Sequence, residues 1–242
     1  MQSDLSAVLD RAGDRAGLRR SSWWIQEAGD GEVSVLPDGE PEPRVVDDYV
    51  RHLYAELRRH NRDVPAGREL RLRMAVHYGP AFPAAKGHAG AGLVVASRLC
   101  DSEPLRRALD GTGAPLAVVL SERVFAETVA EEHTTLDPAD FRQVTVRMKE
   151  FKGQAWILVP GHDLEGIDLD TAGTDDDRGV APGPGGGTGT DADASPPPGA
   201  PGAQPSVPRA EGSVGDYAGA QIHTSHFVGR DETNYYGHGG DR

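Results

Sequence analysis

The recurring apolar pattern that builds secondary structure stops at Pro160, and this break constrains the fold more than any other feature of the 242-residue sequence. Residues 161–215 contain 13 Gly and 8 Pro among 55 residues, with three consecutive aspartates at 175–177. A segment of this composition cannot bury enough apolar surface to offset its loss of conformational entropy. The sequence therefore predicts a folded domain over 1–160, a disordered linker over 161–215 and a short C-terminal segment over 216–242.

The charge of the chain follows the same division. Residues 1–160 carry 24 acidic and 21 basic residues, net −3, whereas residues 161–242 carry 14 acidic and 4 basic residues, net −10. Since the domain has no basic stripe, binding to nucleic acid through its phosphates is not expected. No apolar run approaches the ~20 residues that span a bilayer, so no membrane segment is expected.

A single cysteine, Cys100, rules out an internal disulfide and a cysteine-based zinc cluster. Residues 1–17 contain three aspartates and no apolar core of a secretion signal. We therefore expect a cytoplasmic protein.

Hydrophobic periodicity predicts that strands alternate with helices over 1–160, which is typical of a layered α/β sandwich (α+β). The sequence around Gly29-Asp30-Gly31 predicts a β-hairpin, and residues 79–90 are predicted to form a glycine-rich loop. Ser121 is predicted to cap a helix that runs through Val129. The expected elements, in order, are a helix at 3–19, the hairpin, a helix at 45–61, a strand at 70–76, helices at 91–100 and 104–109, a strand at 115–121, the helix after Ser121, and strands at 141–149 and 154–160.

Three local patterns give this order a more specific meaning. RLRMAVHYGPA, residues 71–81, resembles a strand of the form R-(I/M)-x-(I/V)-H-x-G, and GAGLVVASRL, residues 90–99, resembles a helix of the form G-x-x-V-N-x-A-(A/S)-R-L. AGDGEV, residues 28–33, resembles a hairpin that carries a metal-binding aspartate. Together they resemble the catalytic domain of class III adenylate and guanylate cyclases, in a divergent form found in actinobacterial signalling proteins.

The resemblance implies a ferredoxin-like nucleotide cyclase fold that lacks its first strand, because the sequence begins at the first helix. It also implies a homodimer, since cyclase domains pair head to tail. An active cyclase holds Mg²⁺ or Mn²⁺ with ATP or GTP between two aspartates, which clamp the attacking and leaving oxygens. Asp30 matches the second aspartate, while the strand that would carry the first is absent.

The remaining family positions are matched only in part. Arg98 matches the catalytic arginine that stabilises charge on the phosphates. The ribose-orienting asparagine is replaced by Val94, the base-reading lysine by Gln26, and the second base reader falls near Gly87. Lys149 or Lys152 matches a late lysine that contacts phosphate.

Losing one preorganised donor typically costs ~10²–10³ in rate, and several are altered here. The sequence thus predicts a catalytically degenerate regulatory or scaffolding domain. One alternative is an active cyclase whose start lies upstream of Met1, and another is a sensor that binds nucleotide without converting it. Without its partner, Asp30 also fits an ordinary hairpin turn.

The C-terminal segment suggests a second role. QIHTSHFVGRDETNYYG, residues 221–237, is a short β-prone stretch that resembles the amyloid-type signalling tails of filamentous bacteria. Such a stretch on a long linker predicts that residues 216–242 recruit a signalling partner. The alternative is a disordered end without a partner.

Overall fold

A computed structural model describes residues 2–28, 31–65, 68–85, 87–148, 151–169 and 222–230. The first half contains a 3₁₀ turn at Arg20–Ser22 and a π-helical turn at Val45–Tyr49. The helices are α1 (Gln2–Arg15), α2 (Glu42–Arg44), α3 (Val50–Arg62), α4 (Ala91–Cys100), α5 (Glu103–Thr112) and α6 (Glu122–Phe125). The strands are β1 (Trp24–Ala28), β2 (Gly31–Val35), β3 (Leu72–Pro80), β4 (Phe82–Ala84), β5 (Gly87–Ala89), β6 (Leu116–Ser121), β7 (Arg142–Met148), β8 (Phe151–Leu158) and β9 (Ile222–Arg230).

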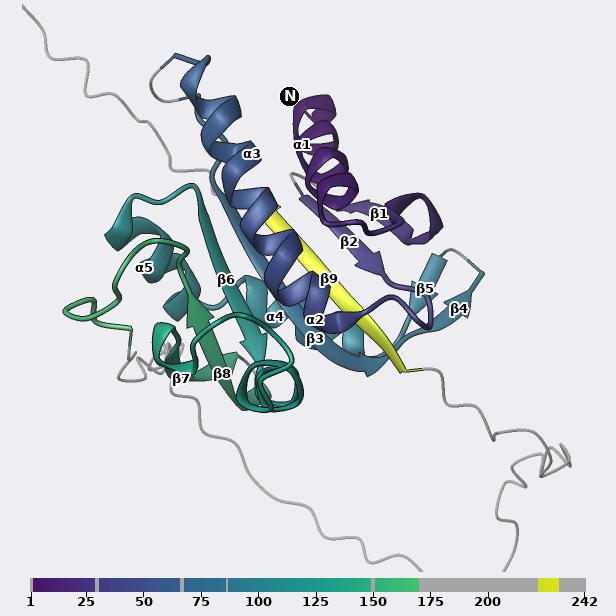
Figure 1. The fold of residues 1–242 in the computed structure, drawn as a ribbon. Helices are drawn as coiled ribbons and strands as arrows, with labels where there is room; N and C mark the ends of the chain where they lie inside the picture. Colours follow the sequence, from purple (N-terminus) through teal and green to yellow (C-terminus); the bar gives the residue numbers. More distant parts are fainter. Residues whose placement is uncertain are drawn as a thin grey trace, which may run out of the picture. The chain divides into compact units, whose positions relative to one another are not determined.

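Seven of these strands form one sheet in the order β1-β2-β9-β3-β6-β8-β7. β3 and β6 are parallel, and every other neighbouring pair is antiparallel. β9 comes from the far end of the sequence and lies between β2 and β3, as the yellow strand in Figure 1 shows. The chain therefore has a mixed α/β sandwich in which a C-terminal segment is a central strand.

Both faces of the central strands are buried, because their alternating residues enter two different apolar clusters. Helices α1 and α3 pack against each other and lie on the same side of the sheet (Figure 1). The first core, on that side, includes Leu9, Leu53, Leu57, Leu72, Met74, Val76, Leu116, Val118 and Leu120. The second core, on the side of α4 and α5, includes Ala75, Leu99, Leu105, Leu109, Ala117, Val119, Val146, Ala155 and Ile157.

Periodicity predicted the main elements correctly, from the first helix and the hairpin to the last two strands. Two predictions need correction. The loop predicted over 79–90 contains the hairpin β4–β5, which forms a separate two-stranded sheet. Ser121 precedes α6, but its side chain makes no capping hydrogen bond, and its buried Oγ has no hydrogen-bond partner in the described part of the chain.

The chain after β8 stays close to the domain as far as residue 169. Leu164 and Leu169 are buried in the second core, and Ile167 packs against it. The rest of the predicted linker, residues 170–215, lies outside the described residues. Of the predicted C-terminal segment, the structure describes β9 alone.

Two glycines allow α4 to start directly against the end of β3. A Cβ atom at Gly92 would lie 2.7 Å from the carbonyl carbon of Gly79, and one at Gly79 would lie 2.9 Å from Cα of Gly92. Since both contacts involve backbone atoms, no side chain fits at either position. This close approach fixes the start of the helix that carries Val94 and Arg98.

Candidate functional site

The residues predicted to form a nucleotide site lie on three separate elements. Gln26 lies on β1, Arg98 on α4 and Lys152 on β8. Asp30, the predicted metal ligand, and Lys149, the alternative phosphate contact, lie outside the described residues.

Gln26 and Gly87 are neighbours in the structure. A Cβ atom built on Gly87 would lie 3.2 Å from Oε1 of Gln26 and 2.6 Å from the indole ring of Trp24. The rings of Trp24 and His88 are 4.4 Å apart, so the β4–β5 hairpin packs against β1 here. The fold thus brings together the two positions at which the cyclase resemblance expects the nucleotide base to be read.

Arg98 lies on the part of α4 that the second core leaves partly uncovered. Leu99 and Cys100 beside it are buried, whereas Val94, one turn earlier on the same side of the helix, is 49% exposed. Within the described part of the chain, the Arg98 guanidinium makes no ion pair or hydrogen bond. α4 therefore presents an available cation beside an exposed valine.

Lys152 does not join this group. Phe151 packs against the second core, so strand alternation places Lys152 on the opposite face of β8. Four strands also separate β8 from β1 in the sheet, which is roughly 24 Å at the usual strand spacing. A single chain therefore does not gather Gln26, Arg98 and Lys152 around one small molecule.

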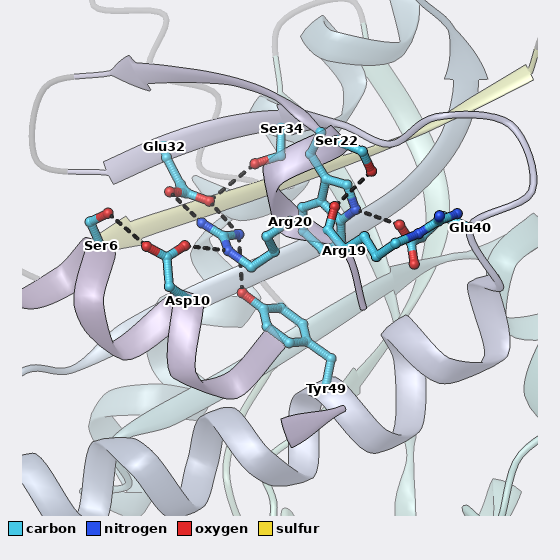
Figure 2. A network of polar contacts seen from close by, with 10 residues as sticks. Ser6, Asp10, Arg19, Arg20, Ser22, Glu32, Ser34, Glu40 and Tyr49 are labelled. Carbon is cyan, nitrogen blue, oxygen red and sulfur yellow. Dashed lines mark hydrogen bonds and ion pairs between the residues drawn. The ribbon is translucent and has the colours of Figure 1, made fainter. Parts of the chain in front are cut away.

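The strongest polar cluster of the described residues lies elsewhere, around Arg20 (Figure 2). The Arg20 guanidinium donates to both carboxylate oxygens of Glu32, at 2.9 and 3.1 Å, and its Nε donates to Asp10 at 2.9 Å. It also lies 3.4 Å from the Tyr49 hydroxyl, and Ser34 donates to Glu32 at 3.0 Å. The cluster joins α1, the turn at 20–22, β2 and the segment before α3.

Burial sets the ionisation of this cluster. Arg20 is 5% exposed, and burial alone would lower its pKa, yet Tyr49, Glu32 and Asp10 raise the pKa above its usual value. Burial raises the pKa of the Tyr49 hydroxyl, so this group stays neutral at physiological pH. Arg20 is thus permanently charged and already bonded to carboxylates, which fits a structural role rather than the binding of an incoming anion.

A cavity of about 430 Å³ opens beside this cluster. Its polar lining includes Asp10, Asp14, Arg19, Glu27 and Glu32. Acidic residues outnumber basic ones here, and the guanidinium of Arg20 is occupied. The cavity is therefore a poor site for a phosphate group.

Sequence reasoning missed Arg20, Glu32 and Tyr49. Each lies in a different element, and the contacts span 12 and 29 positions of the sequence. The only local signal is that Glu32 stands in a strand whose other residues are mostly apolar. A charged residue in such a strand indicates a buried partner without saying which residue it is.

His77 is a half-buried titratable group near the end of β3. Burial lowers its pKa, and the Arg123 guanidinium lowers it further, to about 4. Its Nδ1 atom is buried and has no hydrogen-bond partner among the residues that the structure describes. These features are typical of a histidine held neutral by the fold.

We expect His77 to make the domain less stable in acid. The unfolded chain binds a proton at a pKa of roughly 6.5, whereas the folded chain binds it only near 4. The unfolded state therefore holds more protons between these values, and the free energy of unfolding falls as the pH falls through this window. Urea unfolding at pH 7.5 and 5 measures this change. Between these two pH values, the free energy of unfolding should fall less for His77→Gln than for the unaltered protein. Equal losses, or an NMR titration of His77 with a midpoint near 6.5, would contradict this.

Among the residues that the structure describes, no three His, Cys, Asp or Glu side chains lie close enough together to hold a metal ion. Within the same ranges, no helix is both long and apolar enough to cross a bilayer.

Comparison with known proteins adds no further assignment. No family model, curated protein or solved structure matches the chain.

Proposed function

We propose that residues 1–160 form a catalytically degenerate nucleotide cyclase-like domain that regulates or scaffolds in bacterial signalling, while the C-terminal segment recruits a partner. The observation that carries this proposal is the surface of α4, where Arg98 is retained and available but Val94 is exposed at the position of the ribose anchor. A valine cannot hydrogen-bond a ribose hydroxyl. The site keeps one electrostatic group and lacks the group that would orient the reacting sugar.

The strand arrangement supports the family assignment. β2 and β3 both run antiparallel to β9, so they are parallel to each other and α3 connects them. With α1 and β1 placed before β2, this order fits a ferredoxin-like sheet in which β9 takes the place that the strand before the first helix has in that fold. The sequence of β9, IHTSHFVGR, contains no carboxylate that would act as the first metal ligand.

Exposed apolar side chains support a role in association. Phe82 on β4 is 57% exposed, and Val94 on α4 is 49% exposed. Exposed apolar side chains are candidates for contact with another molecule. We therefore propose a cytoplasmic homodimer whose contact includes Val94, without nucleic acid and without a resident metal.

Association is tested by Val94→Asp, which places a charge in the proposed contact. We expect the dimer dissociation constant to rise at least tenfold in sedimentation experiments, because burying an unpaired carboxylate is costly. Ala126→Asp, on an exposed position of the helical turn after α6, is the matched control and should leave the constant unchanged. A protein that is monomeric before substitution, or equal effects of both changes, would overturn the dimer proposal.

The second candidate function is a sensor that binds nucleotide without converting it. Two features favour it: the available guanidinium of Arg98, and the contact between Gln26 and Gly87 at the positions expected to read the base. A ligand present at 100 times its dissociation constant stabilises a protein by about 2.7 kcal/mol. A saturable rise in melting temperature with ATP or GTP, lost in Arg98→Ala, would support this candidate. No shift at millimolar nucleotide would remove it.

A further inference from the structure

β9 is the element that joins the two parts of the main sheet. β1–β2 lie on one side of it and β3–β6–β8–β7 on the other. It pairs with four residues of β2, from Glu32 opposite Val228 to Val35 opposite Ser225. It also pairs with nine residues of β3, from Leu72 opposite Arg230 to Pro80 opposite Ile222.

The edges of β2 and β3 would be open without this strand. Each would expose a row of backbone N–H and C=O groups, which readily pair with an extended segment. The neighbouring side chains of β2 and β3 are mostly buried, and the first core joins the two parts through α1 and α3. The domain thus provides an elongated site between β2 and β3 whose two walls are both built by residues before 81.

In the structure, β9 occupies this site, and a long segment of sequence connects β9 to the rest of the domain. The 52 residues between Leu169 and Ile222 reach up to ~170 Å when extended, far more than the domain requires. The strand pairs through its backbone with β2 and with β3, in the way that extended peptides complete sheets in other proteins. The connection also lets the strand leave without moving the rest of the domain.

We infer that the gap between β2 and β3 is a binding site for an extended peptide strand, and that its resident ligand is residues 222–230 of the same chain. This inference rests on the recruiting role of the tail in the proposed function. In the sheet, β3 occupies one backbone edge of residues 222–230 along their whole length, and β2 occupies the other edge at residues 225–228. The tail therefore binds a partner strand only after it has left the sheet, so the domain controls when the tail is available.

A disulfide in the full-length chain tests the position of the strand. Val33→Cys and Phe227→Cys occupy opposite positions in the β2–β9 register. The control pair, Val33→Cys with Ile222→Cys, places the second cysteine five residues away along β9, roughly 17 Å. This exceeds the ~7 Å limit between Cα atoms that a disulfide tolerates. We expect an intramolecular disulfide in the first pair only. Equal oxidation of both pairs, or a product joining two chains, would overturn the inference.

The same variant tests release of the strand. The probe is a fluorescein-labelled peptide of residues 216–237, and its uptake is measured by anisotropy. The reduced Val33→Cys/Phe227→Cys protein should take up the peptide, and oxidation should lower the uptake at least tenfold. The control protein, Val33→Cys/Ile222→Cys, should take up the same amount of peptide whether it is reduced or oxidised. Equal uptake by both redox states, or no uptake by the reduced protein, would overturn control by release. Neither result tests the proposed loss of cyclase activity. That proposal is tested separately, by measuring whether the protein forms cyclic nucleotide.

Discussion

Replacing Glu32 with methionine is expected to lower the free energy of unfolding by roughly 3–5 kcal/mol. The change removes the two Glu32 oxygens that accept from Arg20, and the guanidinium, which is 5% exposed, keeps Asp10 as its carboxylate partner among the described residues. A buried charge without adequate partners is among the costliest defects in a fold. Arg20→Met should have an effect of similar size, because it leaves Glu32 buried. Urea denaturation followed by tryptophan fluorescence measures both, since Trp23 lies against Arg20.

The double variant separates the ion pair from simple packing. Arg20→Met with Glu32→Met removes both charges, so its cost should be at least ~2 kcal/mol smaller than the sum of the two single costs. Arg107→Met, which breaks the exposed pair with Glu103, is the surface control and should cost less than about 1 kcal/mol. Additive effects in the double variant would show that the two side chains do not depend on each other.

Truncating Leu53 on α3 is the other change with a large expected effect. Its side chain is fully buried in the first core, between α3 and the central strands. Leu53→Ala should cost roughly 2–5 kcal/mol through lost burial and the cavity left behind. Leu93→Ala, at a half-buried position of α4, provides the same chemical change with a smaller expected cost. Similar losses for the two variants in urea denaturation would contradict the placement of the core under α3.

The sequence predicted local structure well and the assembly of the sheet poorly. The stripe that includes Leu53 and Leu57 predicts a helix because apolar residues recur every three or four positions. The pairing of β9 with β2 and β3 has no comparable signal, because residues about 140 to 200 positions apart become neighbours. Residues 222–230 read as β-prone, but their place in the sheet depends on backbone edges that only the folded domain creates.

Of the predicted nucleotide site, the sequence alone could predict only the arrangement of residues that are close together in the sequence. Val94 and Arg98 fall one turn apart on α4, as their spacing requires. Gln26 and Gly87 are brought together across 61 positions, which the resemblance implied and periodicity alone does not. Lys152 lies on the other face of the sheet from α4, because strand alternation after Phe151 decides its direction. The Arg20 cluster has only one local sequence signal, the charged Glu32 in a mostly apolar strand, since buried ion pairs depend on tertiary packing.

The central claim of the proposed function is that residues 1–160 do not catalyse cyclisation of a nucleotide. The most direct measurement incubates the purified full-length chain with ATP or GTP and Mn²⁺ and quantifies cyclic nucleotide by mass spectrometry. We predict no product above a protein-free blank with either nucleotide. Formation of cyclic AMP or cyclic GMP by this chain, at a rate that Arg98→Ala or Asp30→Asn abolishes, would contradict the account.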